Sequence, residues 1–287
     1  MTASLPHFAL GSLSEDDLRR LDAKSFVISD DSGVDLPCRL RLLPGATVLF
    51  VMFHAAFDRT KAALPVFARW SYGKVLGGHV LSVCDPTLYL DDELRLGWYV
   101  GSRYADPMQV LLGTANRVRE LLDLAGDRVV FYGSSGGGFA ALRAAASCRF
   151  GRAVVINPQT EITAYFETFV SRFAKVFAPE WTPQECRDRY PLRWSALAAI
   201  ADARLQQRDL RIVYAQNLHD KVHHARHFRP FCGSTDAPIS GGTSADGSVL
   251  THVYASPEGH GAEPPEVVKY IATEGMHHLL APTATHP

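Results

Sequence analysis

The stretch VVFYGSSGGGFAAL, residues 129–142, decides the fold of this chain. Its first four residues are apolar or aromatic, and after Gly133 come two serines, three further glycines and the start of an alanine-rich segment. The pattern predicts a buried strand that turns directly into a helix. Such a corner has three uses: it can cradle a phosphate, form a plain tight turn, or present a nucleophile.

Two phosphate-binding patterns do not fit these glycines. A P-loop requires a lysine after the glycines, and none follows here. The dinucleotide pattern GxGxxG also fails, because the four glycines of residues 133–138 do not have that spacing. The pattern that fits is GxSxG, with Ser135 at its centre.

The geometry of a strand-to-helix turn explains this spacing. The middle residue takes a strained backbone conformation, and its neighbours two positions away must be small, as Gly133 and Gly137 are. The Ser135 hydroxyl then lies clear of the sheet, beside free N–H groups at a helix N-terminus that favour negative charge. Ser134 fits less well, because its register would place Tyr132 at a small site. The alternative is a glycine-rich turn that only brings strand and helix close together.

A serine nucleophile requires a base and an acid, and two later loops supply candidates. Asp220 follows the apolar run RIVYAQN by three residues, and His260 lies between two glycines after VLTHVYAS. Both loops are predicted at the carboxyl end of a strand, the edge of the sheet at which the serine also lies. Asp220 could instead cap the following helix, and His260 could be an ordinary exposed histidine.

The N–H groups that would bind a developing oxyanion are expected in two places. One is Gly136, directly after the serine, and the other is the loop His54-Ala55-Ala56 after the predicted strand 47–53. Small side chains let the backbone of this loop approach a substrate oxygen. Ala55 or Ala56 is therefore the expected second donor.

Four histidines lie close to Asp220 in the sequence, at His219, His223, His224 and His227. Pairs with H-x3-H spacing can bind a metal from one helix face. No HExxH motif accompanies them, and several point to different helix faces. We therefore expect no metal site.

The whole chain predicts one globular domain, residues 1–287, without a nucleic-acid or membrane partner. It has 29 Lys and Arg residues against 30 Asp and Glu residues, so it offers no excess of basic charge to a phosphate backbone. The N-terminal residues lack a signal-peptide pattern, and no run approaches the roughly 20 apolar residues of a membrane span. Five scattered cysteines without a CxxC motif favour free thiols. We therefore expect a cytoplasmic protein.

Strand and helix signals alternate along most of the sequence. The runs SFVIS and LPCRLRLL flank the turn-rich DDSGVD and predict an N-terminal hairpin. From Thr47 onward the alternation predicts an α/β fold with a mostly parallel central sheet and helices on both faces. Residues 158–207, aromatic and interrupted by prolines, predict a helical cap or lid. Residues 233–248, rich in Gly and Ser, predict a mobile surface loop.

Together these features resemble the α/β-hydrolase superfamily. The match consists of the GxSxG corner, the alanine-containing loop, Asp220 and His260, in the family's order, and it covers about residue 45 to the end. The resemblance implies the α/β-hydrolase fold, an acyl-enzyme on Ser135, His260 as general acid and base, and Asp220 as the residue that orients the histidine. It does not name a substrate.

Four further stretches look similar to α/β-hydrolase-like proteins of bacterial surface-polysaccharide synthesis, some of which transfer acetyl groups to sugar hydroxyls. They are LPVFARW, CDPTLYLDDELRLGWYVGS, YGSSGGGFAAL and VINPQT. Candidates for substrate contact lie in or near these stretches and in the alanine-containing loop: His54, Asp85, Trp98, Asn157 and Gln159. Trp98 could instead be core packing, and Asn157 and Gln159 could instead anchor their loop.

Three functions remain open from the sequence. The first is an esterase-type serine hydrolase that cleaves a small or sugar-linked acyl ester and needs no cofactor. The second is an O-acetyltransferase that uses acetyl-CoA and the same Ser135 intermediate to modify a bacterial surface polysaccharide or its precursor. The third is a non-catalytic binding protein on the same fold, against which the intact serine, aspartate and histidine candidates count. The expected ligand is a small-molecule or carbohydrate acyl ester, and the oligomeric state is left open.

Overall fold

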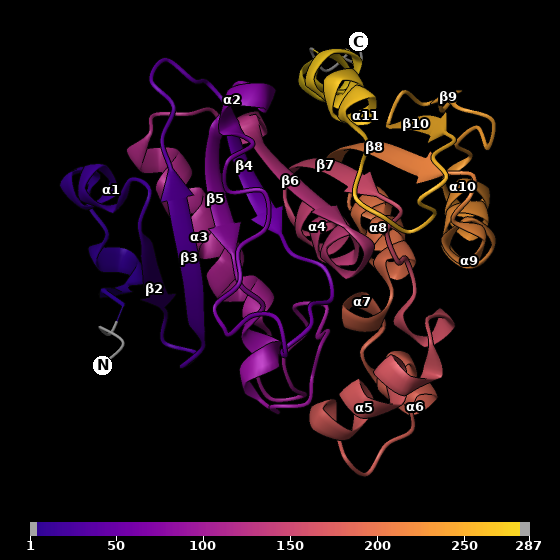
Figure 1. Ribbon diagram of the computed structural model, residues 1–287, viewed down its shortest axis with the longest axis horizontal. Coiled ribbons are helices and arrows are strands. Elements are labelled where there is room, and N and C mark those ends of the chain that lie inside the picture. The colour runs from indigo at the N-terminus through magenta and orange to yellow at the C-terminus, as the bar shows by residue number, and fades with distance from the viewer. Residues whose placement is uncertain (1–4, 282–287) are drawn as a thin grey trace.

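The computed structural model of the chain describes residues 5–281 and has a central sheet with helices on both faces (Figure 1). Ten strands in this range form one sheet in the order β1-β2-β3-β5-β4-β6-β7-β8-β10-β9. The strands are β1 (His7–Ala9), β2 (Ser25–Ser29), β3 (Asp35–Arg41), β4 (Leu49–Phe53), β5 (His79–Val83), β6 (Val129–Ser134), β7 (Phe150–Ile156), β8 (Asp209–Asn217), β9 (Gly242–Thr243) and β10 (Val249–Tyr254). The predicted α/β class is confirmed.

The helices of the described range surround this sheet. They are α1 (Glu15–Leu21), α2 (Gly73–Leu76), α3 (Pro107–Leu121), α4 (Ser135–Ser147), α5 (Glu167–Phe177), α6 (Pro183–Arg189), α7 (Pro191–Trp194), α8 (Ala196–Leu205), α9 (Lys221–His223), α10 (Arg229–Thr235), α11 (Pro265–Tyr270) and α12 (Met276–Leu280). Two π-helical turns, η5 (His224–Phe228) and η6 (Ile271–Gly275), join α9 to α10 and α11 to α12. Within residues 5–281, every helix is too short or too polar to span a bilayer.

The predicted hairpin and the predicted parallel core both form. β2 and β3 are antiparallel, with Phe26 opposite Cys38. The strands β5, β4, β6, β7, β8 and β10 pair in parallel, each with the next. Because parallel strands end at the same edge of a sheet, the loops after β4, β6, β7, β8 and β10 open on one side of the molecule.

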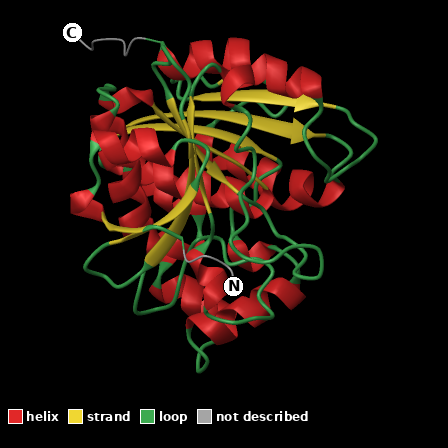
Figure 2. Cartoon of the chain, turned by 60° about the vertical axis from the view of Figure 1, so that its left-hand side comes forward, coloured by secondary structure: helices red, strands yellow, loops and turns green. Residues whose placement is uncertain are grey.

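Side chains of the central strands alternate between two buried layers. In β4, Leu49, Val51 and Phe53 belong to the larger core, which α3 and α4 cover. Phe50 and Met52 belong to the smaller core under α2, α11 and α12. A strand that is covered on both faces has to be apolar throughout, as β4 is. Figure 2 shows helices on both sides of the twisted sheet.

The predicted cap, residues 158–207, and the predicted mobile loop, residues 233–248, both contain regular secondary structure. Residues 158–207 hold α5 to α8, and Figure 1 shows α5 and α6 below the sheet. α8 packs on α4, so the end of this range joins the main helical layer, and movement as a lid is untested. Residues 233–248, expected as a mobile loop, contain the end of α10 and the strand β9, which pairs with β10. The Ser244 and Ser248 hydroxyls donate to Asp246 and order the turn between β9 and β10.

α4 follows β6 without a loop, and two glycines make this close packing possible. A Cβ atom on Gly133 would lie 2.2 Å from the Gly137 carbonyl oxygen. A Cβ atom on Gly137 would lie 2.6 Å from the His54 carbonyl oxygen. Both obstructing atoms are backbone, so no side chain can move aside. The two small sites of the sequence pattern are therefore the contacts that seat α4 against β6 and the end of β4.

Gly133→Ala should lower the free energy of unfolding by about 3 kcal/mol, because backbone atoms in a packed core relax little. Gly233→Ala is the matched control: Gly233 is exposed in α10, no atom lies within 4 Å of an added Cβ, and alanine favours the helix. Urea-induced unfolding measures both free energies. A Gly133→Ala protein as stable as the control would contradict this description of the β6–α4 contact.

Candidate functional site

Ser135 occupies the turn between β6 and α4 in a strained conformation. Its φ angle is 54°, in the left-handed region that residues with a Cβ atom rarely adopt. Such a conformation costs about 1–3 kcal/mol and persists only where the surrounding packing enforces it. The close fit of Gly133 and Gly137 supplies that packing. Only 4% of the Ser135 surface is exposed, and its hydroxyl lies within hydrogen-bond distance of two side chains.

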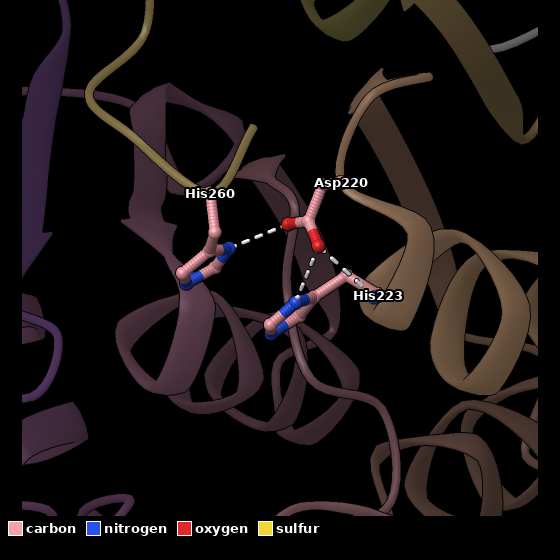
Figure 3. Close-up of side chains that lie close together, drawn as sticks. All are labelled: Asp220, His223 and His260. Carbon is pink, nitrogen blue, oxygen red and sulfur yellow. Dashed lines mark hydrogen bonds and ion pairs between the residues drawn. The ribbon is translucent and has the colours of Figure 1, made fainter. Parts of the chain in front are cut away.

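His260 and Asp220 continue a chain of hydrogen bonds from Ser135. His260 Nε2 lies 3.0 Å from Ser135 Oγ, and His260 Nδ1 lies 2.5 Å from Asp220 Oδ2. Figure 3 shows the Asp220 carboxylate beside the His260 ring. The three predicted residues therefore meet at the edge where the parallel strands end. The His260 side chain is 38% exposed and the Asp220 side chain only 4%, so within these hydrogen-bonded residues the histidine lies nearer to solvent.

A second histidine shares the Asp220 carboxylate. His223 Nδ1 lies 3.0 Å from Asp220 Oδ1, whereas His260 takes Oδ2. The two imidazole rings stack with their centroids 3.9 Å apart and their planes 5° from parallel. The His223 backbone N–H also donates to Oδ1, so Asp220 caps α9 as well. Sequence reasoning missed this ring contact, although a histidine three residues after a capping aspartate lies on the same helical turn.

The charge states of these groups follow from their surroundings. Burial raises the pKa of Asp220, but the hydrogen bonds and charges of His223 and His260 outweigh it and hold this pKa well below its usual value. Burial lowers the pKa of His223, and hydrogen bonding to Asp220 only partly opposes that effect. Asp220 is therefore ionised and His223 neutral near pH 7. Since an ionised carboxylate only accepts, each Nδ1 atom carries the proton that it donates.

The same cluster offers metal-ligating atoms. Atoms of Asp220, His223 and His260 that could bind an ion lie within 4.8 Å of one another. Both Asp220 oxygens accept from imidazole nitrogens, so a cation at this point would compete with these hydrogen bonds. His227, also in the predicted histidine group, accepts from the Thr160 N–H, and its pKa is lowered to about 3, mainly by burial. The contacts describe a hydrogen-bonded cluster.

Gln159, which the sequence assigned to substrate contact or loop anchoring, lies against Ser135. Its Nε2 atom lies 2.9 Å from Ser135 Oγ and 3.1 Å from His223 Nε2. Its Oε1 atom accepts a hydrogen bond from Trp98 Nε1–H at 2.7 Å. Gln159 and Trp98 are both fully buried. Trp98 also packs in the larger core, where its ring contacts that of Phe173.

His54 and Asp85, two further candidates for substrate contact, make internal hydrogen bonds. His54 Nδ1 lies 2.7 Å from the Ala55 carbonyl oxygen, and His54 Nε2 accepts from the Asp85 N–H at 3.0 Å. Asp85 is 1% exposed and accepts from the backbone N–H groups of Thr87 and Tyr99. These contacts shape the loops beside the site. Contact with substrate stays a prediction for both side chains.

Asn157 ties together the ends of three strands. It has a φ angle of 42° directly after β7, and only 1% of its surface is exposed. Its Oδ1 atom accepts from the Asn217 N–H at 2.7 Å, and its Nδ2 atom donates to the Tyr254 hydroxyl at 3.2 Å. Asn217 Nδ2 in turn donates to carbonyl oxygens of Ser256 and Gly259, in the loop that carries the active-site candidate histidine. Asn157 therefore holds the end of β7 to the ends of β8 and β10.

The predicted oxyanion donors lie around the start of α4. Gly136 is in the first turn of α4, and a Cβ atom there would lie 2.4 Å from the Leu96 side chain. The His54 carbonyl oxygen lies beside α4, 2.6 Å from the position of a Cβ atom on Gly137. The His54 N–H donates to the Tyr99 hydroxyl at 3.0 Å. Ala55 and Ala56 remain the candidates in this loop, and the choice between them is untested.

A buried ion pair joins the loop of His260 to the turn at Ser135. Arg69 Nε and a terminal nitrogen lie 2.6 and 2.7 Å from the two carboxylate oxygens of Glu263, and the guanidinium also donates to Ser134 Oγ at 2.9 Å. The two charged side chains are 12% and 2% exposed. No local sequence pattern singles out either residue, because the pair spans 194 positions.

Solved structures of similar fold are found among enzymes. A capsule O-acetyltransferase of Neisseria meningitidis serogroup A, a variant in complex with CoA, aligns with a TM-score of 0.63 and 14% identity over 91% of this chain and 99% of that chain. S-formylglutathione hydrolase from Agrobacterium tumefaciens aligns with a TM-score of 0.57 and 10% identity over 89% and 93%. The chain has an α/β-hydrolase-like fold. The predicted resemblance is thereby confirmed at the level of the fold.

A third similar structure is much longer than this chain. A chain of the glycosylation-associate protein complex from Streptococcus agalactiae aligns with a TM-score of 0.62 and 14% identity over 89% of this chain. The alignment covers 46% of that protein, so this chain spans about half of its length. No family model and no curated protein matches the sequence.

Glu263→Gln should lower the free energy of unfolding by about 3 kcal/mol at neutral pH, because it leaves the Arg69 charge buried without a partner. Glu15→Gln, in the exposed pair with Arg19, is the control and should have little effect. Equal stability of the two variants at pH 7 would contradict a structural role for the buried pair.

The difference between wild type and Glu263→Gln should shrink in acid. Burial raises the pKa of Glu263, but Arg69 outweighs it and holds this pKa below the ordinary glutamate value of 4.5. A group with a lowered folded pKa contributes stability above its ordinary pKa and loses it as the pH falls through the folded pKa. Unfolding curves measured from pH 7 to pH 3 test this trend, and a constant difference would contradict it.

Proposed function

We propose that this protein carries out acyl-ester chemistry through an acyl-enzyme on Ser135, with His260 as general base and Asp220 as the residue that orients it. The observation that supports this proposal is the hydrogen-bonded chain of the three side chains, at 3.0 and 2.5 Å. A serine hydroxyl becomes a useful nucleophile when a positioned base takes its proton, and an ionised carboxylate stabilises the imidazolium that results. The strained turn presents the hydroxyl, and α4 begins at it.

The reaction would run in two halves. In the first, Ser135 Oγ attacks the acyl carbon while its proton passes to His260 Nε2, and the leaving oxygen or sulfur then takes that proton as its bond to the acyl carbon breaks. In the second, water or an alcohol gives a proton to His260 Nε2 and attacks the acyl carbon. The bond to Ser135 Oγ breaks and the proton returns to Oγ. The N–H of Gly136 and one from residues 54–56 would bind the oxyanion.

Esterase-type hydrolysis of a small or sugar-linked acyl ester is the function that this site supports best. It requires the three side chains, the oxyanion donors and water, and no cofactor. The similarity in fold to S-formylglutathione hydrolase agrees with this choice. Ser135 is only 4% exposed, whereas the His260 side chain beside it is 38% exposed.

O-acetyl transfer from acetyl-CoA is the second candidate, and one specific observation favours it. The capsule O-acetyltransferase aligned above, which was solved with CoA, matches this chain over nearly its whole length. The acceptor would be a hydroxyl of a bacterial surface polysaccharide or its precursor, in place of water in the second half of the reaction. A non-catalytic binding role is the third candidate, and the assembled hydrogen-bonded chain counts against it.

Ser135→Ala should abolish labelling by a fluorophosphonate probe and reduce hydrolysis of p-nitrophenyl acetate at least about 10³-fold. Ser147→Ala, an exposed serine of the same helix, is the matched control and should behave as wild type. Mass spectrometry locates the label, and release of p-nitrophenol measures turnover. A wild-type protein that is not labelled at any pH would support the binding role instead.

Addition of acetyl-CoA and an oligosaccharide acceptor should separate the two enzymatic candidates. Free CoA and acetate without acetylated sugar would indicate hydrolysis. Acetylated sugar whose formation requires Ser135 would indicate transfer. Acetylated sugar formed equally by Ser135→Ala would contradict the acyl-enzyme.

A further inference from the structure

The Ser135 hydroxyl belongs to a closed ring of hydrogen bonds that passes through four other side chains. One side runs from Ser135 Oγ through His260 to Asp220 Oδ2, over 3.0 and 2.5 Å. The other side runs from Asp220 Oδ1 through His223 to Gln159 and back to Ser135 Oγ, over 3.0, 3.1 and 2.9 Å. Figure 3 shows the Asp220 carboxylate bridging the two imidazole rings, one on each oxygen. The proposed mechanism uses the first side and has so far given the second side no role.

Donor counting fixes every proton in this ring. Ionised Asp220 accepts Nδ1–H from both histidines, so each ring in its neutral form has a lone pair on Nε2. The Gln159 amide has two N–H hydrogens, one for His223 Nε2 and one for Ser135 Oγ. Because Ser135 Oγ accepts from Gln159, its own hydrogen is left for His260 Nε2. The second side of the ring therefore points the serine proton at the base.

Trp98 fixes the orientation of the amide. Its indole N–H can only donate, so it selects the Gln159 oxygen as its partner and turns the NH₂ group toward Ser135 and His223. The opposite orientation would place the amide oxygen against the lone pair of His223 Nε2. Gln159 and Trp98 are fully buried and His223 is 2% exposed, so water does not compete for these hydrogen bonds.

We propose that Gln159 is a further catalytic residue and that His223 and Trp98 are positioning residues that hold its amide. The inference rests on the proposed function. In the first half of the reaction, as the proton moves from Ser135 Oγ to His260 Nε2, the Gln159 N–H stabilises the charge that develops on Oγ. In the second half, the C–Oγ bond breaks, the proton returns from His260, and the same N–H stabilises the leaving oxygen.

Fluorophosphonate labelling of Ser135 tests this role without a known substrate. Gln159→Met, which keeps the length of the side chain and removes both donors, should slow labelling roughly 10- to 100-fold. Gln159→Glu should be slowed at least as much, because a carboxylate only accepts and competes with His260 for the serine proton. If Gln159 only filled space, the nearly isosteric glutamate would label at the wild-type rate. Gln184→Met, at an exposed position of α6, is the control.

Trp98→Phe provides a second test that leaves Gln159 in place. It removes the indole N–H that orients the amide and keeps an aromatic ring in the core. We expect slower labelling and a lower kcat for p-nitrophenyl acetate at an unchanged KM. The imidazole ¹⁵N resonances of His223 should also shift, because Nε2 loses its donor. This variant keeps the inference testable if Gln159→Met does not fold.

The outcomes separate the two proposals. Wild-type labelling rates in Gln159→Glu or in Trp98→Phe would overturn the role of the Gln159 amide and leave the acyl-enzyme standing. Absence of label in the wild-type protein, or label that persists in Ser135→Ala, would overturn the acyl-enzyme itself. Slow labelling in both the Gln159 and Trp98 variants, with label confined to Ser135, is the expected result.

Discussion

One buried carboxylate, Asp220, organises the site, because each of its oxygens holds a different imidazole ring. Removing a carboxylate from water costs free energy, and three hydrogen bonds offset this cost. They come from the His223 backbone N–H and from the Nδ1 atoms of His223 and His260. The consequence is electrostatic as well as geometric. With Asp220 ionised, both rings carry a proton on Nδ1, and each ring in its neutral form presents a lone pair on the opposite side. This charge, together with the indole N–H of Trp98 that orients Gln159, sets the direction of the hydrogen bonds around the serine.

The backbone supports that arrangement through contacts that leave no room for adjustment. The carboxyl ends of parallel strands bring residues far apart in the chain to one edge, and glycine contacts seat α4 directly on β6 and beside the end of β4. Asn157 and Asn217 then tie the loops after β7, β8 and β10 to one another. A site on such an edge is precise because strand ends, unlike isolated loops, are fixed by the sheet.

The fold and the principal candidates could be predicted because their signals are local. The alternation of strand and helix signals indicates the parallel sheet, and GxSxG needs only five residues to indicate a strained turn at Ser135. Asp220 and His260 are found by their order after predicted strands. The partners of these residues could not be found in this way. The contacts of Gln159 with Ser135 and His223 depend on how segments far apart in the sequence meet, and a glutamine in a loop has no distinctive local pattern. Their role in chemistry remains a proposal.

The ion pair between Arg69 and Glu263 has a consequence for how the protein comes into being. During synthesis the serine leaves the ribosome 125 residues before its histidine. The N-terminal part of the sheet can therefore form before His260 is available to Ser135. The contacts of His260 with Ser135 and of Glu263 with the buried guanidinium form only when residues 260–263 dock on the sheet. The proposed base therefore reaches Ser135 only after a further 125 residues have been made.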